Sequence, residues 1–259
     1  MTYKEQIAAY YPTCEQERVD KKVIYHYIED YPHNILLRSN EIGHLTSSGF
    51  IMNKDLTRVL VIFHKVYQAW GWTGGHMDGD LDCLEVAVKE AKEETGLTHL
   101  TPLSQGMMSI DILPVWGHSK RDNYVSAHLH LNASYVLIAD EKEPLIENVI
   151  ETEGVMWIDV EDLGQYCNEP DLVVVYQKLI KAAKKYNPSK AISVTKQDIT
   201  EDGGLFKVIK DTTIPIAVHE AKSAYYKAKL VKEVASRGGK GIINGVSYLF
   251  KKNKINRSD

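Results

Sequence analysis

The sequence predicts an α/β protein. Three observations favour this class: strand-like segments alternate with helical ones, one helix has a clear apolar stripe, and a later helix ends in lysines. β-branched and aromatic residues are enriched in strands, because they suit a pleated, half-buried surface. Apolar residues that recur every three or four positions instead indicate a helix with one buried face. The pattern therefore favours a mixed fold over an all-helical or all-strand one.

The first elements are expected before residue 70. Residues 15–30 look helical and charged, and Pro32 follows soon after. Residues 44–53 alternate enough to form a strand. Residues 56–65 predict a second strand, which pairs with the first through a turn at 53–55. A loop is expected next, up to a pair of glycines.

A helix is predicted from about Asp82 to Thr95. Asp82 is a suitable N-cap and Gly96 a natural C-terminal stop. The apolar residues recur at helical spacing and predict one buried stripe, which consists of Leu84, Ala87, Val88 and Ala91.

Further strands are expected within residues 100–115, along 123–140 and at 155–160. Residues 169–186 predict a helix whose terminal lysines suit the negative end of the helix dipole. The Asn-Pro-Ser-Lys sequence at 187–190 indicates a boundary.

We therefore divide the chain into residues 1–188 and an extension, 189–259. From Lys190 onward there are 14 Lys and Arg against 7 Asp and Glu, whereas the preceding part has 17 against 28. This asymmetry suggests two units with different roles. Strand-like pieces, a helix from about Val218 to Ser236 and a terminal hairpin predict that the basic extension is a small α+β unit.

The composition is that of an ordinary globular protein, with 44% apolar and 25% charged residues. No apolar stretch approaches the roughly 20 residues that a membrane helix needs, and the polar N-terminus does not resemble a secretory signal. Cys14, Cys83 and Cys167 are odd in number and form no CxxC pair. They favour a reducing, cytoplasmic location and argue against both a disulfide framework and a structural zinc site.

Three glutamates on the helix at 82–95 suggest a metal site. Glu90, Glu93 and Glu94 are three or four residues apart, so we expect them to converge on the face opposite the apolar stripe. Carboxylates this close remain ionised at low cost when a cation lies between them. Hard oxygen ligands favour Mg²⁺ or Mn²⁺, and Mg²⁺ commonly joins carboxylates to substrate phosphates. Paired glutamates on a helix are more often a solvated face, but the preceding glycines at 74 and 75 allow close approach of a ligand and favour the metal site.

The whole stretch resembles the Nudix box, the signature of the Nudix hydrolases. The pattern is Gly, five residues, Glu, seven residues, then Arg-Glu-hydrophobic-any-Glu-Glu-any-Gly-hydrophobic. The corresponding positions are Gly75, Leu81, Lys89, Glu90, Ala91, Glu93, Glu94, Gly96 and Leu97. The resemblance covers roughly residues 40–185, including a later Glu-Gly-Val-Met-Trp segment. It implies an α/β/α sandwich with a mixed β-sheet.

The resemblance also implies a reaction, the hydrolysis of a diphosphate linkage in a nucleoside diphosphate joined to a group X. Glu93 and Glu94 correspond to the principal metal ligands, and Glu90 to a further ligand or to the base. The carbonyl of Gly75 corresponds to another ligand. A glutamate outside the box commonly completes the site, for which Glu151 and Glu153 are candidates; an exposed loop or a turn salt bridge is the alternative.

Two positions depart from the box. Leu81 replaces the first glutamate, and Lys89 replaces an arginine that orients a catalytic glutamate by a bidentate pair, which lysine does not reproduce. Asp78, Asp80 and Asp82 lie nearby in sequence and are candidates to compensate for Leu81. We expect a catalytic site of reduced activity.

Five residues are candidates for substrate binding. His128 and His130 face the same side of a strand, and His76 lies in the glycine loop. Trp72 is a candidate for stacking on a base, and Arg121 for binding a terminal phosphate. For each there is a structural alternative: a hydrogen-bonded strand histidine, a buried tryptophan or a solvated loop.

The partner that the resemblance implies is a small nucleoside diphosphate derivative, and homodimers are common in the family. The alternative function is that of a Nudix-fold, ligand-sensing regulator whose basic extension binds nucleic acid. A structural appendage is the alternative role for that extension. Some Nudix-fold proteins are isoprenoid diphosphate isomerases, but we find no support outside the box for their extra cysteine and metal-binding histidines.

Overall fold

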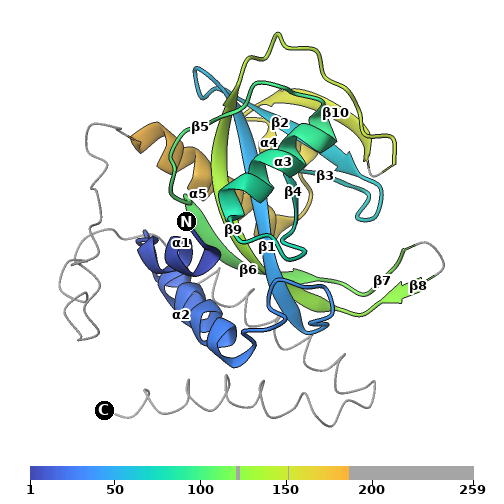
Figure 1. Ribbon diagram of the computed structural model, residues 1–259. Coiled ribbons are helices and arrows are strands. Elements are labelled where there is room, and N and C mark those ends of the chain that lie inside the picture. Colours follow the sequence, from blue (N-terminus) through green and yellow to red (C-terminus); the bar gives the residue numbers. More distant parts are fainter. Residues whose placement is uncertain (121–122, 151, 187–259) are drawn as a thin grey trace, which may run out of the picture. The chain divides into compact units, whose positions relative to one another are not determined.

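The computed structural model describes residues 1–120, 123–150 and 152–186 (Figure 1). All of them belong to the first of two units of the chain, Met1–Val194. The proposed boundary at 188 and the strands, helix and hairpin predicted for 189–259 lie outside the described residues.

Among the described residues, eight strands form one mixed sheet, with the central order β10-β2-β1-β9-β5. The long strands β1 and β9 run parallel from Gly43↔Leu129 to Asn53↔Ala139, whereas the other pairs are antiparallel. A separate hairpin joins β7 and β8. The strands are β1 (Gly43–Asn53), β2 (Arg58–His64), β3 (Ala69–Gly71), β4 (Thr73–His76), β5 (Thr101–Pro102), β6 (Ser109–Val115), β7 (His118–Lys120), β8 (Asn123–Val125), β9 (His128–Ala139) and β10 (Thr152–Asp159).

Helices cover both faces of this sheet, which confirms the predicted α/β/α sandwich (Figure 1). One core cluster joins the sheet to α1, α2 and α3, and a second joins its other face to α4 and α5. The helices are α1 (Tyr3–Ala9), α2 (Glu15–Asp30), α3 (Cys83–Thr95), α4 (Leu163–Tyr166) and α5 (Pro170–Lys185).

The ends of α3 are those that the sequence predicts. The Asp82 side chain accepts hydrogen bonds from the amides of Leu84 and Glu85, which satisfies donors that the helix itself leaves unpaired. Gly96 ends the helix in the left-handed region, with φ of 72°, a conformation that favours glycine.

The apolar stripe predicted for α3 is partly wrong. Ala87 and Ala91 are buried, but Leu84 and Val88 are only half-buried. The buried face instead turns toward Glu94, which is 4% exposed. The carboxylates of α3 therefore do not all lie opposite the apolar face, because Glu94 projects toward the sheet.

Four further features differ from the sequence-based expectations. The loop expected around Trp70 and Trp72 contains the short strand β3, which pairs with β2. The expected glycine loop is itself a strand, β4, which pairs with β1. Residues 3–9 form α1, whose start is fixed by a hydrogen bond from the Tyr3 amide to the Leu81 carbonyl at 2.6 Å. Residues 123–140 form two strands, β8 and β9, instead of one. The pairing of β4 with β1 and the contact of Tyr3 with Leu81 join residues distant in sequence, whereas β3 and β8 pair with the strands just before them.

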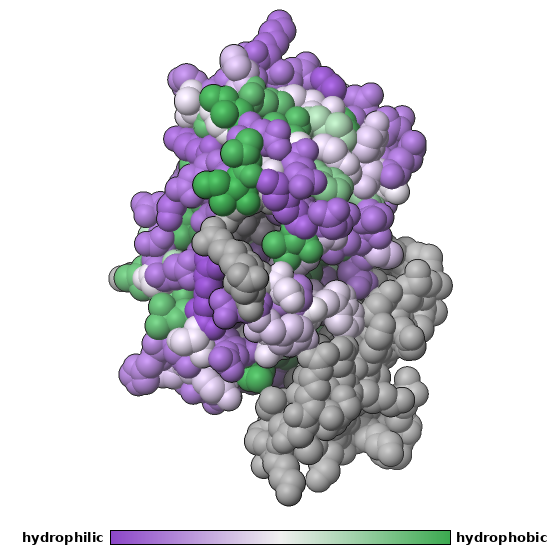
Figure 2. Space-filling model, turned by 90° about the vertical axis from the view of Figure 1, so that its right-hand side faces the viewer, coloured by the Kyte–Doolittle hydropathy of each residue, from purple (hydrophilic) through white to green (hydrophobic). Residues whose placement is uncertain are grey.

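On the face that Figure 2 shows, hydrophobic side chains occur in small groups among hydrophilic ones. Scattered apolar residues are normal on a protein surface. None of the helices in the described part of the chain has both the length and the apolar character needed to cross a bilayer. Cys14, Cys83 and Cys167 are free, and Cys83 and Cys167 are buried.

Candidate functional site

Gly75 and Glu90 are in direct contact. Gly75 lies on β4, opposite Ser47 of β1, and β4 packs beside α3. A β-carbon at Gly75 would lie 2.3 Å from Cδ of Glu90 and 2.5 and 2.6 Å from its two oxygens. No side chain fits there unless the carboxylate moves. The glycine therefore lets the Glu90 carboxylate reach the backbone of β4.

Glu94 also reaches this strand. Its Oε2 accepts a hydrogen bond from the amide of Gly74 at 3.0 Å. A buried carboxylate needs such donors, because removal from water otherwise disfavours its charged form. Two of the three predicted glutamates, Glu90 and Glu94, are thus held against neighbouring glycines of one strand.

Glu93 occupies the outer side of α3 and is exposed. Lys89 and Leu81 are exposed as well. Two of the aspartates expected to compensate for Leu81 have other partners: both oxygens of Asp78 pair with Arg38, at 2.9 and 2.7 Å, and Asp82 caps α3. Asp80 is exposed, and its compensating role stays a prediction.

The residues in this region fit a hard divalent cation such as Mg²⁺ or Mn²⁺. Carboxylate oxygens are the ligands that these ions prefer. The Glu90 carboxylate occupies the space that a β-carbon at Gly75 would fill, so one carboxylate of the predicted donor set lies against the backbone of β4. The metal-binding role predicted for Gly75, Glu90, Glu93 and Glu94 stays a prediction.

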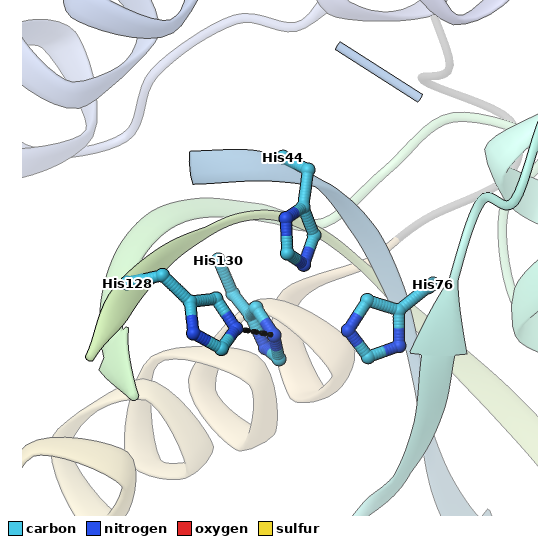
Figure 3. Close-up of side chains that lie close together, drawn as sticks. All are labelled: His44, His76, His128 and His130. Carbon is cyan, nitrogen blue, oxygen red and sulfur yellow. Dashed lines mark hydrogen bonds between the residues drawn. The ribbon is translucent and has the colours of Figure 1, made fainter. Parts of the chain in front are cut away.

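Three of the predicted substrate-binding residues come together with a fourth that the sequence did not single out. His128 and His130 of β9, His76 at the end of β4 and His44 of β1 form one group (Figure 3). Each offers one ring nitrogen within 4.8 Å of the others. His44 was missed because its position follows from the parallel register of β1 and β9, in which it lies opposite His130.

The histidine rings are favoured in their neutral form. Burial lowers the pKa of His76 to about 3 and lowers that of His130 well below its ordinary value. Burial also lowers the pKa of His44 and of His128. In the low-dielectric interior, protonation of one ring would disfavour protonation of its neighbours.

The remaining predicted residues lie elsewhere or outside the described part. Trp72 is 8% exposed, and its ring packs edge-on against Tyr176 with centroids 5.2 Å apart. Its stacking role stays a prediction. Glu153 is exposed on β10, and β2 separates that strand from β1. Arg121 and Glu151 fall outside the described residues.

Comparisons with known proteins agree with this architecture. Residues 43–182 match the family model described as NUDIX domain. No curated protein matches this chain.

Several solved structures are similar. A binary complex of the C. elegans Ap4A hydrolase has 15% identity and a TM-score of 0.43, covering 55% of this chain and 98% of its own. A Clostridium perfringens hydrolase of the NUDIX family has 23% identity and a TM-score of 0.39, covering 53% and 96%. The NUDIX domain of Shewanella oneidensis NrtR, complexed with ADP ribose, has 18% identity and a TM-score of 0.38, covering 60% and 96%. Sequence identities and TM-scores this low do not indicate which substrate the chain binds.

Proposed function

This chain belongs to the Nudix family, and we propose that it is a metal-dependent enzyme that cleaves the diphosphate linkage of a nucleoside diphosphate joined to a group X. The observation that carries the proposal is the contact of two carboxylates with two successive glycines: Glu94 with the amide of Gly74, and Glu90 with the α-carbon region of Gly75. The products of the proposed hydrolysis would be a nucleotide and phosphorylated X.

The glutamates have distinct roles in this proposal. Glu90, Glu93 and Glu94, with the Gly75 carbonyl, would hold Mg²⁺ or Mn²⁺. When bound, the ion supplies neutralisation of phosphate charge and lowers the pKa of water. Glu93 faces solvent, whereas Glu94 is fixed by the backbone of β4.

Glu90 has two alternative roles, as a ligand or as the base that accepts the proton of the attacking water. Its carboxylate lies against Gly75, and the arginine of the box is Lys89 in this chain. This contact would compensate in part for the lost bidentate pair, since orientation of a reacting group contributes strongly to rate.

A panel of dinucleotides and nucleotide sugars, with Mg²⁺ and with Mn²⁺, tests the proposal through release of phosphorylated products. We expect Glu93→Gln and Glu94→Gln each to lower kcat by on the order of 10² to 10⁴. Glu85→Gln is the matched control, because Glu85 is exposed on the same helix but outside the glutamate set. Turnover that survives both substitutions, or a panel with no turnover at all, contradicts the proposal.

A further inference from the structure

The four histidines converge on one point from three strands. In Figure 3 the rings of His44, His76, His128 and His130 are directed toward a common centre. The ring centroids of neighbours are 4.9–5.3 Å apart, and the candidate ligand nitrogens all lie within 4.8 Å of one another. Burial alone does not favour four ring nitrogens facing one another, because buried polar atoms need partners.

Outer contacts fix two of these rings with Nε2 toward the centre. Nδ1 of His44 lies 3.0 Å from the Asn40 carbonyl, and Nδ1 of His128 lies 2.8 Å from the Ser126 carbonyl. A carbonyl only accepts, so each Nδ1 carries the proton and donates it, which leaves a lone pair on Nε2. Metal-binding histidines are usually oriented by such second contacts.

The ring nitrogens that face the common centre need a hydrogen-bond donor or a metal ion as a partner. Within the part of the chain that the structure describes, Nε2 of His44 has no hydrogen-bond partner, although this side chain is 3% exposed. Nε2 of His128 lies 3.2 Å from Nε2 of His130. A proton shared by Nε2 of His128 and Nε2 of His130 satisfies only those two atoms. The lone pair on Nε2 of His44 then has no donor, which costs free energy because the atom is buried.

The spacing suits a small tetrahedral ion. Two nitrogens bound at about 2.0–2.1 Å to a tetrahedral zinc are about 3.3 Å apart. The separation of 3.2 Å between His128 and His130 is close to this value. The other nitrogens, within 4.8 Å, need only modest ring movements to reach it.

We propose that His44, His76, His128 and His130 form a second metal site, which binds one divalent transition-metal ion, Zn²⁺ before others, and not Mg²⁺. Neutral imidazole suits zinc, copper, iron and nickel, whereas carboxylate sets suit magnesium and manganese. The nearby positive charge of Arg38 is offset, because its guanidinium pairs with both oxygens of Asp78. The imidazole site would thus select a transition metal, whereas the carboxylate site would select Mg²⁺ or Mn²⁺.

A filled site of this kind would be structural. Four protein ligands leave no open position on a tetrahedral ion, in contrast to catalytic zinc sites. The ion would join β1, β4 and β9, and His76 directly follows Gly75 in sequence. It would thereby hold the strand that carries the glycine pair. This inference does not depend on the proposed hydrolysis.

The test uses the full chain, freed of metal with a chelator and then titrated separately with Zn²⁺, Co²⁺ and Mg²⁺. We expect one equivalent of Zn²⁺ to remain after desalting, as measured by elemental mass spectrometry. Co²⁺ should give the intense visible absorption of tetrahedral coordination. Zn²⁺ at a hundredfold excess over its dissociation constant should raise Tm by about 5 °C or more. Mg²⁺ should compete with neither ion.

Variants assign the binding to these residues. His44→Gln and His130→Gln should each weaken Co²⁺ binding at least tenfold and remove the tetrahedral absorption. His26→Gln is the matched control, because His26 is exposed on α2 and should bind like the wild type. Glu93→Gln should retain the full Zn²⁺ equivalent, which separates this site from the hydrolytic one.

Two results would overturn the inference. One is metal-free wild-type protein that takes up no stoichiometric Zn²⁺ or Co²⁺, a measurement that does not depend on any variant folding. The other is uptake with unchanged affinity and absorption in both His44→Gln and His130→Gln. The four rings would then be only a packed, hydrogen-bonded group.

Discussion

At the scale of single residues, Gly75 shows how a missing side chain positions a functional one. The Glu90 carboxylate occupies the space where a β-carbon would project, so the two positions constrain one another. The family pattern contains a glycine here, and the contact gives a physical reason for it: any other residue would displace a carboxylate of the proposed metal site.

We predict that Gly75→Ala lowers kcat by on the order of 10², because displacement of a reacting group by about 1 Å has an effect of this size. The fold should change little, since the Glu90 side chain yields more easily than backbone. The measurement is kcat with Mg²⁺ alongside Tm. Gly164→Ala is the control, because an added β-carbon there meets nothing within 4 Å. Equal kcat values for the two variants would contradict the prediction.

At the scale of elements, the start of α3 is joined to α1 through one carboxylate. Asp82 caps α3 and also accepts from Nε2 of Gln6 at 2.9 Å and from the N-terminal ammonium at 3.3 Å. Burial alone would raise the pKa of Asp82, but the hydrogen bonds from Gln6, from the helix amides and from the terminus outweigh it and lower the pKa. The ionised form is therefore favoured in the folded state.

We predict that Asp82→Ala lowers the free energy of unfolding by about 1–2 kcal/mol at neutral pH, the usual effect of removing an N-cap. Asp82→Asn should retain the cap and cost less. Because the folded-state pKa is depressed, the contribution of the charge is present above the ordinary pKa of 3.8 and is lost as pH falls through the folded value.

Urea unfolding between neutral pH and pH 3 measures both effects. The difference in stability between the wild type and Asp82→Asn should shrink as the medium becomes acidic. A difference that stays constant or grows in acid would show that the charge of Asp82 does not contribute in this way.

At the scale of the whole molecule, a buried charge network joins three elements. Nζ of Lys178 on α5 lies 2.6 Å from Oδ1 of Asp111 on β6 and 3.2 Å from Oε1 of Glu17 on α2. The side chains of both acids are almost completely buried. Burial alone would lower the pKa of Lys178, but the two carboxylates outweigh it and raise the pKa.

We predict that Lys178→Met lowers the free energy of unfolding by about 3–5 kcal/mol, because it leaves buried carboxylates without their cation. The readout is the free energy from urea unfolding. Lys181→Met, at an exposed position of the same helix, should change it by less than about 0.5 kcal/mol. Similar effects of both substitutions would mean that the network does not hold α2, β6 and α5 together.

The sequence alone determined the features that depend on local spacing. These are the helix from Asp82 to Thr95 with its cap and its terminal glycine, the long strands and the last helix, because hydrophobic period and capping act over a few residues. The glutamate pattern was sufficient for the resemblance to the family that the chain belongs to. The glutamate pattern did not reveal on which side of the helix Glu94 lies, since that depends on how α3 packs against the sheet.

Only the tertiary structure decided which distant residues meet. His44 and His130 are neighbours because β1 and β9 run in parallel. Gly75 meets Glu90 because β4 pairs with β1 and α3 packs against both strands. Cysteine spacing argued against a zinc site, whereas the four histidines of the proposed site come from three strands, and only His128 and His130 show a spacing in the sequence. Strand register is set by the whole hydrophobic core and by the connections around it, and no window of the sequence contains that information.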